Sequence, residues 1–234
     1  MTTVLGAAGI YSDDFAGVTF PDPAASWTKR NETGGAAITQ TGYGTADAFA
    51  QFSIPGGTAY EQFTTVGGLC LEQACSGATA FTLTAKVETL PSVNGQEVGL
   101  YVVNTAETQG AYIALYYSGG GLNAFSTNFI TNPTPDLDVG VSYTAPAYLR
   151  LSHDGGDSFT CAASDTGAFG GEQNTVTFNR ALLDPAKVGI YCGSFNDGGI
   201  PAFTTQFDYV FESSAVISPE DDIPATTRRV MVIA

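Results

Sequence analysis

Hydrophobic and polar residues alternate with a period of two through several short segments of the chain. The clearest segment is residues 81–87, where Phe81, Leu83, Ala85 and Val87 are separated by threonine and lysine. This alternation places successive side chains on opposite faces of a β-strand, so one face packs on a core and the other faces solvent. Similar patterns predict further strands at residues 12–15, 36–39, 48–52, 98–103, 111–117, 122–127, 148–153, 158–163, 187–192 and 206–211. The chain is therefore predicted to be all-β and antiparallel.

Turn-forming residues separate these segments. Glycine and aspartate at 154–157 predict a tight turn between two strands, and the three glycines at 119–121 predict another, because these residues tolerate positive φ. Asn94-Gly95 predicts a hairpin between residues 81–87 and the next strand. The prolines within residues 128–146 predict a loop there, and only residues 179–183 have a helical period.

The second half of the chain resembles a known family. The strings YLRLSHDGGDSFTCAASDTGAF, VGIYCGSF and FTTQFDYVFES are similar to the second half of concanavalin-A-like lectin/glucanase sandwiches, above all to the laminin-G-like domains appended to some glycoside hydrolases. Residues 12–15, Ser-Asp-Asp-Phe, followed by Trp27, resemble the opening of that family. Two positions depart from its pattern: Thr166-Gly167 follows Asp165 in place of a glycine, and Phe169 stands where a tryptophan is usual.

The resemblance implies a jelly-roll β-sandwich over residues 1–213, followed by an extended tail at 214–234. Enzymes, lectins and scaffolds share this fold, so it does not fix the function. Glycoside hydrolases on this fold use the pattern Glu-x-Asp-x-x-Glu, which is absent; Asp136 and Asp138 come nearest. No nucleophile motif of the type G-x-S-x-G occurs either. We therefore expect a protein that is not an enzyme.

Charge and hydropathy narrow the classes of partner. The formal net charge is −15 with only 8 basic residues, which argues against nucleic-acid binding. No segment approaches the roughly 20 apolar residues of a membrane span. The first residues lack the basic region and the apolar run of a signal peptide. These features predict a location in a virion or in the cytoplasm of the producing cell.

Cysteine, histidine and tryptophan are few. Cys70 and Cys75 are close enough for a small-loop disulfide, whereas Cys161 and Cys192 fall on inward strand faces, so free thiols and at least one disulfide both remain open. The single histidine, His153, adjoins a turn and is predicted to be solvated. For Trp27, a place in the core is favoured over a platform for stacking sugars.

Two non-catalytic sites are candidates. Asp13, Asp14 and Asp208 lie on the first and last predicted strands, and together they would suit Ca²⁺; the alternative is solvated carboxylates and a turn cap. The second is a set of aromatic and basic side chains predicted to face solvent on one sheet. They would stack on a glycan, form a subunit interface, or lie under loops. The set comprises Tyr101, Tyr112, Tyr116, Tyr148, Arg150 and Tyr191.

The tail ends in a basic pair, Arg228 and Arg229, followed by the apolar run Val230, Met231, Val232 and Ile233. An exposed run of high β-propensity favours pairing with another chain, such as another copy or another virion protein; the alternative is a tail folded back on its own sandwich. This ending, a basic pair followed by a short apolar run, resembles the C-termini of some phage structural proteins.

Together these features predict a non-catalytic binding or scaffold sandwich, a phage virion-surface protein of the decoration or tail-attached kind with affinity for glycans. A free-standing carbohydrate-binding lectin module is the alternative. A glycoside hydrolase without the usual acid pair ranks third.

Overall fold

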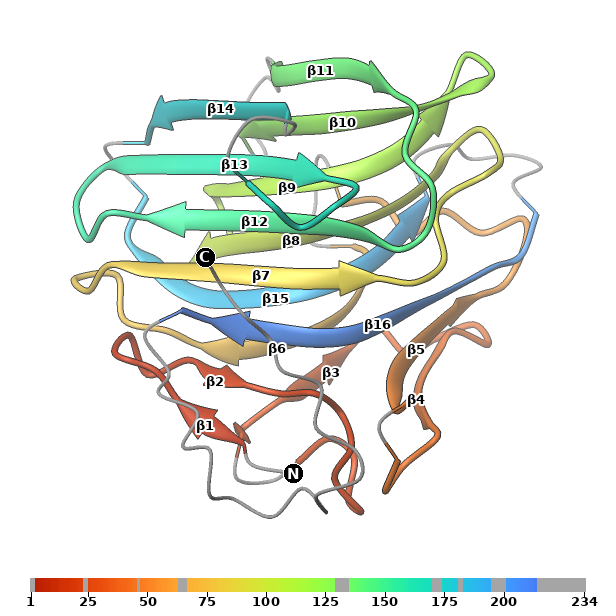
Figure 1. The fold of residues 1–234 in the computed structure, drawn as a ribbon, viewed down its shortest axis with the longest axis horizontal. Helices are drawn as coiled ribbons and strands as arrows, with labels where there is room; N and C mark the ends of the chain where they lie inside the picture. Colours follow the sequence, from red (N-terminus) through yellow and green to blue (C-terminus); the bar gives the residue numbers. More distant parts are fainter. Residues whose placement is uncertain are drawn as a thin grey trace.

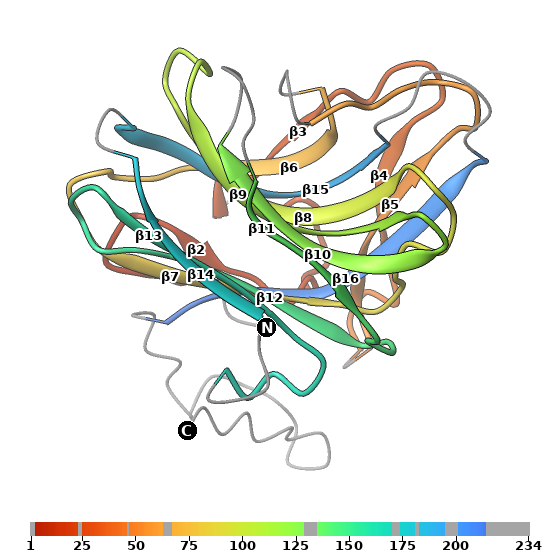
Figure 2. The same ribbon diagram turned by 90° about the horizontal axis from the view of Figure 1, so that it is seen from above.

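A computed structural model of the chain describes residues 3–22, 25–45, 47–62, 67–128, 135–169, 174–180, 183–194 and 201–213. Their regular structure consists of β-strands, and two seven-stranded antiparallel sheets pack face to face (Figures 1 and 2). The predicted all-β antiparallel sandwich is thus confirmed. None of the described residues belongs to a helix able to span a membrane.

We name the sheets after their central strands. The β8 sheet has the order β11 (Pro135–Val141), β10 (Gly121–Asn128), β9 (Gly110–Ser118), β8 (Gln96–Asn104), β15 (Pro185–Ser194), β6 (Leu69–Ala74) and β3 (Thr28–Arg30). The β7 sheet has the order β14 (Asn174–Asn179), β13 (Ser158–Ser164), β12 (Ala147–His153), β7 (Phe81–Val87), β16 (Phe203–Glu212), β5 (Phe49–Ile54) and β4 (Ala37–Thr41). Strands β1 (Val4–Leu5) and β2 (Tyr11–Ser12) form a small separate ribbon.

The core lies between the two sheets, where the inward faces of alternating strands meet. In β7 the burial pattern alternates along the whole strand, with Leu83 almost fully buried and Thr82 and Thr84 partly exposed. Phe207 of β16 packs edge-on against Phe52 of β5, with ring centroids 5.3 Å apart. The inward set predicted for residues 81–87 is therefore confirmed.

The hairpins predicted at residues 154–157 and 119–121 are confirmed, whereas the hairpin predicted at Asn94-Gly95 is wrong. Strand β12 pairs with β13, and β9 pairs with β10, as their turn residues indicate. Strands β7 and β8, however, belong to different sheets, so the chain crosses from one layer to the other at Gly95. The Gln96 side chain holds this turn by accepting hydrogen bonds from the backbone of Ser92 and Val93.

One other local prediction is wrong. Residues 135–141, predicted to be loop, form the edge strand β11, where Pro135 is tolerated because it occupies the first position. The helical period at 179–183 begins at Asn179, the last residue of strand β14, and residues 181 and 182 lie outside the described residues, so it stays a prediction.

The histidine, the tryptophan and most of the cysteines are buried. His153 is only 2% exposed, so the prediction that it is solvated is wrong. Its ring stacks on Phe159 with the centroids 4.6 Å apart, and its Nε2 lies 2.9 Å from the carbonyl oxygen of Gly77. Trp27 is buried in the core, as expected. All four cysteines are free thiols, with Cys161 and Cys192 on the inward faces.

Candidate functional site

The outer face of the β8 sheet, turned away from the β7 sheet, is the candidate site. Figure 2 shows the strands of this sheet bending so that this face is concave. Because side chains alternate along β8, Val98 and Leu100 enter the core, whereas Glu97 and Tyr101 lie on the concave face. The facing positions of β9 and β15 carry Tyr112 and Tyr191.

Five aromatic rings form a continuous ladder across this face. Consecutive centroids are 6.1 Å apart from Tyr101 to Tyr191, 6.3 Å from Tyr191 to Tyr112, 6.1 Å from Tyr112 to Phe125 and 5.3 Å from Phe125 to Tyr116. The first four rings are buried, and Tyr116, at the β10 side, is half-buried. The sandwich thus has a second apolar layer outside its main core.

Three hydroxyl groups of this aromatic ladder meet carboxylates. Tyr101 donates to Oε2 of Glu72 at 2.6 Å, and Tyr116 donates to Oδ1 of Asp138 at 2.9 Å.

The third hydroxyl, of Tyr191, approaches Oε2 of Glu97 at 3.4 Å. Burial raises the pKa of Tyr101 and Tyr191 well above the ordinary value, so both remain neutral donors. Each of these three carboxylates therefore accepts a hydrogen bond from a tyrosine hydroxyl.

Glu97 is a fully buried carboxyl group. Burial raises its pKa well above the ordinary value, and the negative charge of Glu61 adds to the effect. Room for it comes from Gly193 on the neighbouring strand, where a Cβ atom would lie 2.5 Å from Glu97 Oε1. The group therefore favours the protonated form, in which it costs less to bury.

The prediction that six aromatic and basic residues lie on one sheet is wrong. Tyr148 and Arg150 lie on β12 of the β7 sheet, and the Arg150 guanidinium rests 4.2 Å from the centroid of Phe169. Of the members on the β8 sheet, Tyr101, Tyr112 and Tyr191 are buried. Alternation identifies the face of a strand, but not its sheet nor the segments that cover it. A role in ligand binding stays a prediction for all six.

A cluster of four charged residues lies at the β3 side of the concave face. Arg30 pairs with both carboxylate oxygens of Glu107 at 2.7 Å, and Lys187 reaches Glu107 at 2.8 Å and Glu72 at 3.2 Å. Hydrogen bonds from Arg30, with help from Lys187, lower the pKa of Glu107 to about 2. Glu107 is therefore ionised throughout the physiological range.

The geometry gives no support to the calcium site predicted at Asp13, Asp14 and Asp208, which stays a prediction. Each carboxylate has a protein partner of its own: Asp13 accepts hydrogen bonds from Phe15 and Trp27, Asp14 accepts one from Ala16, and Asp208 pairs with Lys86 at 2.7 Å. Within the ranges that the structure describes, no group of three His, Cys, Asp or Glu side chains could hold a metal ion.

The tail residues 228–233 lie outside the described residues, so their interaction stays a prediction. Conversely, sequence reasoning missed Glu72, Glu97, Arg30 and Lys187. The signal for the two glutamates was present: Glu72 follows the inward Leu71, and Glu97 precedes the inward Val98, which puts both on the outer face. The burial of that face could not be read from alternation.

No protein-family model and no curated protein sequence matches the chain, but many solved structures share its architecture. A functionally unknown protein from Saccharomyces cerevisiae matches with a TM-score of 0.57 at 15% identity, over 82% of this chain and 98% of that one. A GH43 glycoside hydrolase displaying endo-xylanase and exo-arabinofuranosidase activity has a TM-score of 0.63 at 12% identity, over 91% of this chain and 42% of that one.

A third similar structure is a Bacteroides ovatus mixed-linkage glucan GH16 protein in complex with its G4G4G3G product. Its TM-score is 0.54 at 10% identity, over 86% of this chain and 98% of that chain. The fold is a concanavalin-A-like β-sandwich. The GH43 match covers less than half of its enzyme, so the likeness is to one sandwich domain of a larger protein. At these identities the concanavalin-A-like likeness concerns the fold alone.

Proposed function

We propose that this sandwich is a non-catalytic glycan-binding module, and that the ligand contacts the concave face at its β9–β11 end. The observation that carries the proposal is the arrangement around Tyr116. Its ring is half-buried and braced edge-on by Phe125, and its hydroxyl is anchored on the exposed Asp138. Asn123, directly opposite Tyr116 on β10, adds an amide on the same face.

This combination suits a neutral sugar ring. A tyrosine held in one orientation stacks on the apolar face of a sugar at little cost in side-chain entropy. Asp138 and Asn123 supply an acceptor and a donor for the hydroxyl groups at the ring edge. The similar GH16 structure contains a glucan product, and the similar GH43 enzyme acts as a xylanase, so mixed-linkage β-glucan and arabinoxylan are the first ligands to test.

The proposed lack of catalysis rests on the carboxylates of the concave face. Hydrolysis on such a fold needs two carboxyl groups that flank the scissile bond at a separation of about 5–9.5 Å. Here Glu72, Glu97 and Asp138 come from three separate strands, each accepts a tyrosine hydroxyl, and Glu97 is fully buried. A place on a phage virion is supported by sequence features alone and stays a prediction.

Affinity electrophoresis in gels containing each neutral polysaccharide tests the proposal, together with an assay for released reducing ends. We expect the polysaccharide to retard the wild-type protein. Tyr116→Ala should weaken the affinity about tenfold, which corresponds to a loss of about 1.4 kcal/mol in binding free energy. Tyr43→Ala removes another exposed tyrosine, which follows strand β4 at the edge of the β7 sheet, and should change nothing. Weakening by Tyr148→Ala instead would move the site to the β7 sheet, and released reducing ends would refute the non-catalytic assignment.

A further inference from the structure

The charged cluster at the β3 side holds one carboxylate in an arrangement usual for ligand recognition. Both terminal nitrogens of Arg30 donate to the two oxygens of Glu107, each at 2.7 Å, and Lys187 adds a third bond at 2.8 Å. A bidentate arginine plus a second cation is a strong way for a protein to bind a planar carboxylate. Two of the eight basic residues in the chain converge on this one group.

Three members of the cluster are fixed by the β8 sheet, and only Glu107 is not. Arg30 lies on β3, Lys187 on β15 and Glu72 on β6, where Glu72 is also held by the Tyr101 hydroxyl. Glu107 belongs to the turn between β8 and β9 and has a left-handed φ of 55°. The cations therefore form a preset site, and Glu107 reaches it from a connecting turn.

Glu107 contributes little to stability in this position. The side chains of Arg30 and Glu107 are each 25% exposed and that of Lys187 is 35% exposed, and ion pairs with such exposure are weak because water competes for the charges. Without Glu107, the ion-pair partner left to Arg30 and Lys187 among the described residues would be Glu72, so these three groups would carry one net positive charge. The net charge of the chain is −15, so most of its surface repels anions. A locally positive site is therefore the place where an anionic ligand would bind.

We propose that Arg30 and Lys187 form a subsite for the carboxylate of a hexuronate in a glycan, and that Glu107 occupies this subsite until the ligand displaces it. The inference rests on the proposed glycan-binding function and adds the substrate class. A hexuronate carboxylate has the shape and charge of the Glu107 group, so exchange requires no proton transfer. Thr28, exposed on β3 and on the same face as Arg30, offers a hydroxyl for the sugar ring.

Removing the internal competitor tests the proposal. Binding of oligogalacturonate is measured by isothermal titration calorimetry for the wild-type protein, Glu107→Ala, and Glu107→Ala combined with Arg30→Ala. We expect Glu107→Ala to bind at least about tenfold more tightly than wild type, and the added Arg30→Ala to abolish the gain. Glu88→Ala is the charge-matched control, because Glu88 pairs with Lys86 of the β7 sheet, away from this face.

An unchanged affinity for Glu107→Ala would overturn the proposal, as would an equal gain in Glu88→Ala or a gain that survives Arg30→Ala. Melting curves followed by circular dichroism accompany each variant. Should Glu107→Ala fail to fold, Lys187→Gln replaces it and is expected to weaken oligogalacturonate binding; unchanged binding would again overturn the proposal. Neutral polysaccharides test Tyr116 and oligogalacturonate tests Arg30, so a failure of the hexuronate subsite can be told apart from a failure of the neutral-sugar site.

Discussion

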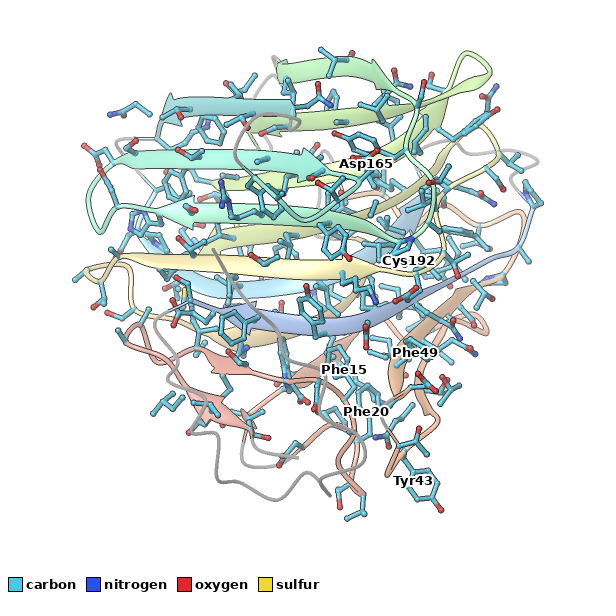
Figure 3. All side chains as sticks on the ribbon, viewed as in Figure 1. Phe15, Phe20, Tyr43, Phe49, Asp165 and Cys192 are labelled. Carbon is cyan, nitrogen blue, oxygen red and sulfur yellow. The ribbon has the colours of Figure 1, made fainter. Side chains whose placement is uncertain are left out.

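The indole Nε1 of Trp27 donates a 3.0 Å hydrogen bond to Oδ2 of Asp13, and both side chains are buried. The other oxygen of Asp13 accepts the backbone N–H of Phe15, whose ring lies beside Phe20 (Figure 3). Despite these two bonds, burial raises the pKa of Asp13 to about 7, helped by the charges of Asp14 and Asp22. One titrating carboxyl group therefore touches the single tryptophan of the chain.

The emission of Trp27 is expected to change with an apparent pKa near 7. Because the pKa of Asp13 is higher in the folded protein than its ordinary value of 3.8, the folded state binds more protons between these limits. The contribution of Asp13 to the free energy of unfolding is therefore fully present below about pH 3.8 and is lost as the pH rises to about 7. The loss is on the order of 4 kcal/mol at most. In Asp13→Asn the fluorescence transition should vanish; its persistence would assign it to another group.

Glu97→Gln is expected to raise the melting temperature at pH 8 and to have little effect near pH 4. The raised pKa of Glu97 means that its contribution is present below the ordinary value of 4.5 and is lost at higher pH, and glutamine removes that loss. Melting curves at both pH values test this. Asp138→Asn, on the exposed part of the same face, is the matched control, and an equal increase there would contradict the burial argument.

Gly99→Ala should destabilise the protein by about 1–3 kcal/mol, as overpacking of a tight site does. The new Cβ atom would lie 2.3 Å from the Tyr191 ring and 2.6 Å from the backbone oxygen of Ile113, so the ring or the strand must shift. Denaturant unfolding measures the loss. Gly121→Ala, with no atom within 4 Å of its Cβ position, should be tolerated. Equal behaviour of the two variants would show that the tyrosine ladder is loosely packed.

Ending the chain after Ser213 should leave a folded sandwich, because the last strand of the β7 sheet ends at Glu212. We expect such a protein to keep its melting temperature and to lose any self-association of the full chain. Light scattering after size exclusion compares the two forms. A truncated protein that assembles as the full chain does would reject the predicted role of residues 214–234.

Alternation predicted the strands and the core well because both depend on neighbours two residues apart. Residues 81–87 and 148–153 were placed within a residue, and Leu83 and Leu149 are buried as expected. The partner of each strand was harder to predict. Asn94-Gly95 has the composition of a hairpin, yet the flanking strands find their partners in opposite sheets.

The candidate site was predicted only in part, since its residues meet through long-range packing. Tyr116 was identified, but its partners Phe125 and Asp138 come from β10 and β11, the latter predicted to be loop. Arg30 and Glu107 are 77 residues apart, and no local pattern connects them. A buried outer face also breaks the rule that one face of a sandwich sheet meets water.

The order of strands has a consequence for how the chain is made. Of the strands in the described residues, the last two in sequence lie inside the sheets: β15 between β8 and β6, and β16 between β7 and β5. During synthesis each sheet must therefore wait as two separate halves with unpaired edges until residues 185–212 emerge from the ribosome. Such late, long-range pairing makes folding slow and leaves the nascent halves open to association with other chains.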